Sequence, residues 1–127
     1  MAGELSGKRV LVVDDDADIL TAIQTAMVDA GAQVDTAADG NQAVSKATET
    51  DPDLIVLDLM LPKRSGFLVA EKLKSGKDKG EKPRVIMITG NPGQRHRTYA
   101  DRIGVEAYFT KPFRMDRLVE SAEKLFA

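Results

Sequence analysis

Short runs of continuous apolar residues that stop abruptly at polar side chains constrain the fold of this chain more than any other feature. Three such runs, with the residues that end them, are 9–13 with Asp14, 54–57 with Asp58 and 85–88 with Thr89. Continuous rather than alternating apolarity indicates strands that are covered on both faces, as in a parallel sheet. Two weaker runs, at 32–37 and 107–110, are also expected to be strands. The strands are therefore predicted to lie between layers of helices.

The segments between and after these runs repeat apolar residues at helical spacing. The predicted helices cover 18–30, 41–50, 65–74, 94–103 and 114–126. Asp16 can cap the start of the first helix, and Gly31 stands where a helix C′ glycine belongs. The fourth helix is predicted to be short, because Asn91-Pro92-Gly93 precede it and it holds few apolar residues. Strand and helix alternate five times, which predicts an α/β fold: a doubly wound five-stranded parallel sheet in the order 2-1-3-4-5, with five helices.

Size and composition exclude several classes of protein. With 127 residues, the chain is expected to form one domain over 1–127, with a core at about 8–126. It has no cysteine, which excludes disulfides and zinc–thiolate sites, and its net charge of −2 gives no reason to expect direct nucleic-acid binding. No apolar run approaches the roughly 20 residues that cross a bilayer, and residues 1–9 lack the apolar core of a signal peptide. We therefore expect a cytoplasmic protein that does not span a membrane.

Two basic segments are expected to lie in solvent. Residues 74–83 are rich in lysine and glycine, so they are predicted to form a flexible loop with exposed lysines. His96, the only histidine, lies between Arg95 and Arg97. We expect it on a solvated face, because a lone histidine cannot make a metal site. The basic cluster at 95–97 could also touch a partner.

Five polar side chains follow the ends of the predicted strands: Asp14, Asp15, Asp58, Thr89 and Lys111. The carboxyl ends of parallel strands lie along one edge of a sheet, and ligands bind there where the strand order reverses. Three carboxylates at one place repel one another unless a cation or a shared proton is present, and hard oxygen ligands suit Mg²⁺ better than Zn²⁺. Lys111 and Thr89 could contact the oxygens of a phosphate. Asp58 could be a nucleophile that forms an aspartyl-phosphate.

Four segments, in this order, resemble the receiver domain of two-component response regulators. They are Val-Val-Asp-Asp-Asp at 12–16, Leu-Asp-Leu-Met-Leu-Pro at 57–62 with Gly66, Met-Ile-Thr-Gly at 87–90, and Tyr-Phe-Thr-Lys-Pro-Phe at 108–113. The resemblance extends over 8–125 and implies the flavodoxin-like form of the predicted fold. It also implies phosphorelay signalling, in which the chain takes a phosphoryl group from a histidine kinase or a histidine phosphotransfer protein.

The resemblance implies a role for each residue of the site. Asp58 would accept the phosphoryl group. It would also hold Mg²⁺ with Asp15 and the backbone carbonyl of Met60, and Asp14 would support the ion through water. Further implied features are phosphate pairing by Lys111, a switch of Thr89 and Tyr108 toward the phosphate, and a cis bond before Pro112. The surface of the fourth helix, fifth strand and fifth helix would carry the signal to an unknown downstream protein or to a second copy of the chain.

Three positions depart from the family pattern or vary within it. Gly90 follows Thr89, where the family usually has alanine or serine, and gives the loop more conformational freedom. Met60 and Asn91 occupy two variable positions thought to tune phosphate lifetime. An amide at Asn91 could orient an attacking water, whereas Met60 cannot, so the pair predicts no particular lifetime.

Two other functions fit part of the sequence. A small phosphatase with an aspartyl-phosphate intermediate would explain Asp14-x-Asp16 after a strand, but the following threonine is missing and 127 residues leave no room for a substrate cap. A phosphorylation-independent binding module would not need the whole set of site residues. Taken alone, 14–16 could be a helix cap and Tyr108 a packing residue. We expect a signalling domain with no output domain in this chain and no catalysis beyond its own phosphorylation and dephosphorylation.

Overall fold

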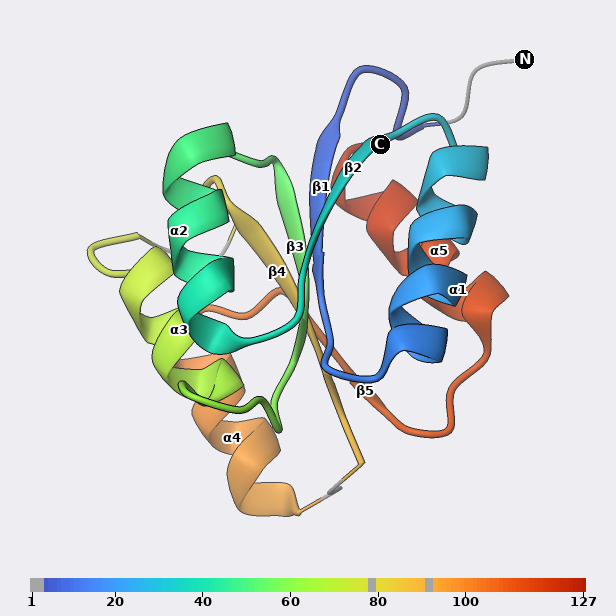
Figure 1. The fold of residues 1–127 in the computed structure, drawn as a ribbon. Coiled ribbons are helices and arrows are strands. Elements are labelled where there is room, and N and C mark those ends of the chain that lie inside the picture. Colours follow the sequence, from blue (N-terminus) through green and yellow to red (C-terminus); the bar gives the residue numbers. More distant parts are fainter. Residues whose placement is uncertain (1–3, 78–79, 91–92) are drawn as a thin grey trace.

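Five strands form one parallel sheet in the predicted order, β2-β1-β3-β4-β5 (Figure 1). The computed structural model describes residues 4–77, 80–90 and 93–127, without the side chains of Gln94 and Arg95. The strands are β1 (Arg9–Val13), β2 (Gln33–Ala37), β3 (Leu54–Asp58), β4 (Arg84–Thr89) and β5 (Ala107–Thr110). All neighbouring strands pair in parallel, and β1 lies beside β3. The chain direction across the sheet therefore reverses at β1 and β3, which places the ligand-binding crevice at their carboxyl ends.

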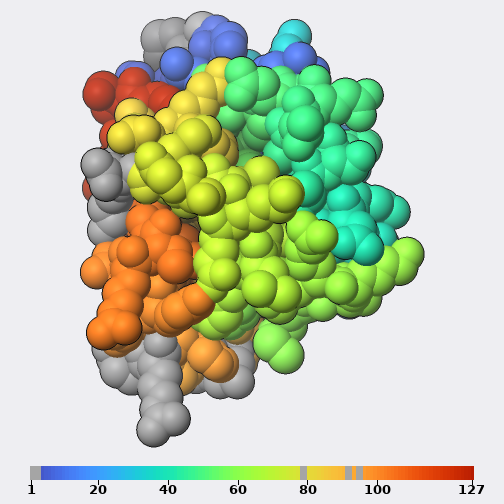
Figure 2. Space-filling view, turned by 90° about the vertical axis from the view of Figure 1, so that its left-hand side faces the viewer, coloured from blue at the N-terminus to red at the C-terminus, as the bar shows by residue number. Residues whose placement is uncertain are grey.

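Helices cover both faces of this sheet. They are α1 (Ala17–Asp29), α2 (Gly40–Thr50), α3 (Gly66–Leu73), α4 (Gln94–Arg102) and α5 (Met115–Leu125). α1 and α5 lie on one face, and α2, α3 and α4 lie on the other, which Figure 2 turns toward the viewer (Figures 1 and 2). Successive residues of β1 point to opposite faces, so Leu11 packs with α2 and α3 while Val10 packs with α1 and α5. Both faces of the strands are buried, which explains the continuous apolar runs.

The predicted signals at both ends of α1 are confirmed. Asp16 is the N-cap, and its Oδ1 accepts hydrogen bonds from the backbone N–H groups of Asp18 and Ile19 at 2.9 and 3.2 Å. Gly31 follows the C-cap with a φ of +106°, a conformation that favours glycine. The first helix therefore begins and ends where its local sequence directs.

The helices are short. α1 has 13 residues, whereas α4 has nine and follows Gly93, which offers no side-chain cap. The fourth helix thus fills nine of its ten predicted positions and is longer than α3, and Asn91 and Pro92 before it lie outside the described residues. Within the ranges that the structure describes, none of the helices combines the length and the apolarity that crossing a bilayer requires.

His96 is half-buried, so the prediction of a solvated face is wrong for this residue. Its ring meets the ring of Phe67 in α3 edge-on, with the centroids 5.6 Å apart. Its Nδ1 atom is buried and has no hydrogen-bond partner among the described residues. The prediction fails because α4 turns His96 toward α3, while the neighbouring Arg97 is exposed as expected.

The lysine-rich segment 74–83 contains a second correction. Lys74, predicted to lie in solvent, is buried, and its Nζ lies 2.8 Å from Oε2 of Glu106, with the two side chains 1% and 2% exposed. Nζ also donates to two backbone carbonyl oxygens of the segment, at 2.9 and 3.2 Å. Burial of this ammonium group is possible because these acceptors replace water. The other described lysines of the segment are exposed, as predicted, and residues 78–79 lie outside the described part.

Candidate functional site

Three carboxylates meet at the carboxyl edge of the sheet, between β1 and β3. Asp14 and Asp15 follow β1 directly, and Asp58 is the last residue of β3. One carboxylate oxygen of each lies within 4.8 Å of the others. Asp14 and Asp58 are buried, at 0% and 3% exposure, whereas Asp15 is exposed. The cluster therefore opens to solvent on the side of Asp15.

Lys111 reaches into this cluster from the loop after β5. Its Nζ lies 3.2 Å from Oδ2 of Asp14 and 3.1 Å from Oδ2 of Asp58, so one ammonium group bridges the two buried carboxylates. Its backbone N–H donates to the carbonyl oxygen of Thr89 at 2.7 Å, which ties this loop to the end of β4. The bond between Lys111 and Pro112 is cis, as the resemblance implied. One ammonium group thus contacts two of the three carboxylates in the cluster.

Burial and charge shift the pKa values of both partners in this contact. Burial raises the pKa of Asp58 above its ordinary value of 3.8, and the charge of Asp14 adds to the rise. The backbone N–H of Met60, 3.0 Å from Oδ1 of Asp58, and the side chain of Lys111 act in the opposite direction without cancelling it. Burial acts to lower the pKa of Lys111, but its hydrogen bonds and charge contacts with Asp58 and Asp14 outweigh burial and raise it. Lys111 therefore stays protonated, and ionising Asp58 costs more free energy in the folded chain than in the unfolded chain.

This donor set fits a hard divalent cation. The ligand atoms of the cluster are carboxylate oxygens, which Mg²⁺ prefers, and the open side at Asp15 leaves room for the waters that Mg²⁺ usually keeps. The raised pKa of Asp58 indicates that the ionised cluster is short of positive charge, which a cation would supply. Zn²⁺ fits less well, because it prefers nitrogen and sulfur ligands.

Replacing Asp58 with asparagine is expected to stabilise the metal-free chain at neutral pH. The folded chain keeps a proton on Asp58 at a higher pH than the unfolded chain does, so ionising this group opposes folding. The cost is fully present above the raised pKa and disappears below about 3.8, where both states are protonated. Unfolding temperatures in EDTA should therefore favour Asp58→Asn at pH 7, with a difference that shrinks as the pH falls. A less stable Asp58→Asn at pH 7 would contradict this.

Thr89 and Tyr108 lie on the face of the sheet that α4 covers. Thr89 ends β4 at the same edge as the carboxylates and is buried, and Tyr108 pairs with Met87 on the neighbouring strand, so the register places both side chains on one face. The Tyr108 hydroxyl is buried and has no hydrogen-bond partner in the described part of the chain. Burial raises the pKa of Tyr108, and the charge of Arg97 lowers it by less. Among the described residues, no hydrogen bond therefore fixes this ring.

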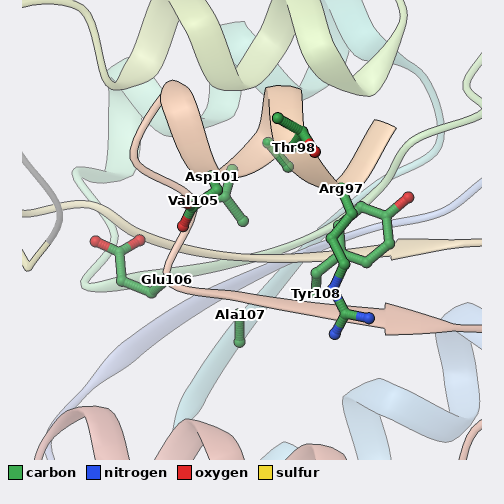
Figure 3. Close-up of a pocket in the computed structure, with 8 residues that line it drawn as sticks. Arg97, Thr98, Asp101, Val105, Glu106, Ala107 and Tyr108 are labelled. Atoms are coloured by element: carbon green, nitrogen blue, oxygen red, sulfur yellow. The ribbon is translucent and has the colours of Figure 1, made fainter. Parts of the chain in front are cut away.

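A pocket of about 360 Å³ lies between α4 and β5, beside Tyr108 (Figure 3). Arg97 and Tyr108 both line this pocket, and the guanidinium carbon of Arg97 lies 5.6 Å from the centroid of the Tyr108 ring (Figure 3). Asp101 and Glu106 line the same pocket, so its wall carries both signs of charge. This surface belongs to α4 and β5, two of the three elements that the resemblance implies for signalling.

The sequence of this chain matches a known family over most of its length. The family model for the response regulator receiver domain matches residues 10–123. The chain belongs to this family. It is a phosphorylation-accepting receiver domain of two-component signalling, a class of domain that interacts with histidine kinases.

Known relatives of this receiver domain agree in sequence and in fold. The alkaline phosphatase synthesis transcriptional regulatory protein PhoP of Bacillus subtilis is 39% identical over 106 residues, which cover 84% of this chain and 43% of PhoP. Protein PilG of Pseudomonas aeruginosa is 30% identical over 119 residues, or 94% of this chain and 87% of PilG. The Francisella response regulator 1452 receiver domain superposes with a TM-score of 0.85 at 28% identity, covering 94% of this chain and 97% of that one. The receiver domain thus spans less than half of PhoP and most of PilG.

These findings confirm the predicted fold and family and give no support to the small phosphatase or to the phosphorylation-independent module. The structure brings Asp14, Asp58 and Lys111 into direct contact, with Asp15 beside them and Thr89 at the same edge. The sequence reasoning missed the segment just after β2, which packs against the loop that follows β3. The strand-end rule does not find it, because Ala38 separates Asp39 and Gly40 from the end of β2.

Proposed function

We propose that Asp58 accepts the phosphoryl group of this receiver domain in a reaction that depends on Mg²⁺. The observation that carries the proposal is the position of the Asp58 carboxylate. It is buried at the end of β3, it lies 3.1 Å from the ammonium of Lys111, and its cluster opens to solvent at Asp15. A donor can therefore approach from the open side while the chain holds the nucleophile in place.

In this proposal the residues of the site have distinct roles. Asp15, Asp58 and the backbone carbonyl of Met60 hold Mg²⁺, and Asp14 supports it through water. When bound, Mg²⁺ offsets the carboxylate charge and stabilises the charge on the phosphoryl oxygens. An oxygen of Asp58 forms a bond to phosphorus as the bond between phosphorus and the donor's histidine nitrogen breaks. The electron pair of the broken bond stays on that nitrogen.

Phosphorylation then changes the contacts around Asp58. Lys111 pairs with an oxygen of the phosphoryl group, because its ammonium already reaches the Asp58 carboxylate. Thr89 turns its hydroxyl toward another oxygen. Tyr108 follows, because no hydrogen bond holds its hydroxyl among the residues described. The surface of α4, β5 and α5 changes with these side chains.

The proposed partners follow from this chemistry. The donor is a histidine kinase or a histidine phosphotransfer protein. The surface of α4, β5 and α5 signals to a downstream protein or pairs with a second copy of the chain. We place this chain in the cytoplasm as one receiver domain over 1–127, without direct nucleic-acid contact. It catalyses only its own phosphorylation and dephosphorylation.

Incubation with acetyl phosphate and Mg²⁺, followed by intact mass spectrometry, tests the acceptor. We expect the wild type to gain the mass of one phosphoryl group and Asp58→Asn to gain none, because the amide keeps the shape of the side chain but is not a nucleophile. EDTA should prevent the gain in the wild type. Asp53→Asn is the matched control, since Asp53 lies before β3, at its other end, and should leave the gain intact. No gain in the wild type, or a gain that survives in Asp58→Asn, contradicts the proposal.

A further inference from the structure

The first residue of α2 fits so closely against the loop between β3 and α3 that it has no room for a side chain. A methyl group at Gly40 would lie 2.1 Å from the carbonyl oxygen of Arg64 and 2.5 Å from its Cβ atom. The φ of Gly40 lies outside the left-handed region, so this contact, and not the backbone conformation, requires glycine. In the space-filling view the loop (green) lies directly against the start of α2 (teal) (Figure 2).

Polar contacts on both sides of Gly40 hold the same loop. The N–H of Gly40 donates to the carbonyl oxygen of Pro62 at 3.3 Å, and Nζ of Lys63 lies 3.7 Å from Oδ2 of Asp39. Asp39 is buried and caps α2, because its Oδ1 accepts a hydrogen bond from the N–H of Gln42 at 2.8 Å. The side chain of Gln42 accepts in turn from the backbone just before the helix, at 3.0 Å. The start of α2 is thus a well-fixed surface on which the loop rests.

The loop that packs against the start of α2 follows Asp58, the last residue of β3. Leu59 is buried, and its N–H donates to the carbonyl oxygen of Ile88 at 2.8 Å. The N–H of Met60 donates to Oδ1 of Asp58 at 3.0 Å, but its side chain is 60% exposed. Leu61 packs partly on the core, and the next two residues are exposed. Because core packing holds this stretch only in part, its contact with α2 contributes to its position.

We propose that Gly40 is a positioning residue for the phosphorylation site. The inference rests on the proposed function, in which the backbone carbonyl of Met60 is a ligand of Mg²⁺. The close fit of Gly40 against Arg64 sets the distance of the loop from the sheet edge. A larger side chain at this position pushes the loop away and moves the Met60 oxygen away from the carboxylates. Gly40 touches neither the metal nor the phosphoryl group and acts through the loop.

Isothermal titration calorimetry with Mg²⁺ alone tests this role in Gly40→Ala. We expect the affinity for Mg²⁺ to fall about tenfold, an effect typical of losing a group that orients a metal ligand. Saturating Mg²⁺ should restore phosphorylation by acetyl phosphate. The matched control is Ala47→Gly, seven positions further along the same helix, which weakens α2 through its lower helix propensity and leaves Asp39 and Gly40 unchanged. Its affinity for Mg²⁺ should equal that of the wild type.

The outcomes separate a positioning role from a purely structural one. A folded Gly40→Ala with wild-type affinity for Mg²⁺ overturns the proposal, and so does an equal loss in Ala47→Gly. If Gly40→Ala does not fold, Lys63→Met decides, because this side chain is exposed and tolerates the change. Losing a positive charge on this loop would by itself strengthen Mg²⁺ binding, so a loss of affinity, expected to be about twofold, reports the loosened contact with Asp39. Equal or tighter binding in Lys63→Met then overturns the role.

The calorimetric measurement also separates this proposal from the proposed function. A wild type that binds Mg²⁺ but gains no phosphoryl group overturns the assignment of Asp58 as acceptor. The effect of Gly40→Ala on Mg²⁺ affinity is read without phosphorylation. The positioning role therefore stands or fails on its own data.

Discussion

Replacing Asp15 with alanine is expected to abolish the Mg²⁺-dependent phosphorylation of Asp58 while changing the free energy of unfolding in EDTA by less than about 0.5 kcal/mol. The side chain of Asp15 is exposed, and in the described part of the chain it forms no hydrogen bond or ion pair. Removing this side chain therefore changes the free energy of unfolding little. The proposed metal site, by contrast, loses the carboxylate on its open side.

The neighbouring aspartate gives a matched control with the opposite pattern. Asp16 caps α1 through two backbone N–H groups, so Asp16→Ala should lower the free energy of unfolding by about 1 kcal/mol and leave phosphorylation intact. Intact mass after acetyl phosphate treatment and urea unfolding in EDTA measure the two quantities. Retained phosphorylation in Asp15→Ala would remove this residue from the metal site. A large loss of its stability would assign it a structural role instead.

The order and the ends of the strands were predictable because strands that are buried on both faces consist of continuous apolar residues. The run at 9–13 is β1 to the residue, and the run at 54–57 is β3 short of its last residue, Asp58. The ends of β1, β3 and β4 were also clear, since each of these three apolar runs stops at a polar residue. The helices depended on weaker apolar spacing, and their predicted ends differ from the observed ones by at most one residue.

The convergence of the site residues was predictable for a topological reason. A parallel sheet places all its strand carboxyl ends on one edge, so residues 97 positions apart, Asp14 and Lys111, meet without any local signal of contact. The rule requires only that each polar residue follow directly after a strand. It does not identify residues that support the site from other segments, which is why the close contact of Gly40 with the loop after β3 was not predicted.

The two wrong predictions share a physical cause. His96 and Lys74 are polar residues in polar stretches of sequence, where exposure is the expected state. Each is buried, partly or wholly, by a contact with a distant segment: Phe67 lies 29 positions from His96 (96 − 67), and Glu106 lies 32 positions from Lys74. No strand-end rule applies to these contacts. They depend on how α3, α4 and the start of β5 pack together, which composition does not reveal.

The buried pair of Lys74 and Glu106 leads to the largest expected change in stability. Lys74→Met keeps most of the apolar stem but removes the ammonium, so the Glu106 carboxylate remains buried with the N–H groups of Gly80 and Val85 and without its cation. Removing one partner of a buried ion pair costs about 3–5 kcal/mol, and we expect a loss of this size in the free energy of unfolding from urea denaturation.

An exposed lysine of the same segment provides the comparison that makes this result interpretable. Lys82 is 49% exposed and pairs with Asp51 and Asp53 at the surface, where solvent screens the interaction, so Lys82→Met should change the stability little. Pairing Lys74→Met with Glu106→Leu should recover much of the loss, because replacing both charges leaves no unpaired buried carboxylate. If Lys74→Met loses no more than Lys82→Met, the ion pair does not hold this segment to β5. A double variant as unstable as Lys74→Met alone would instead assign the loss to the backbone carbonyls that Lys74 also contacts.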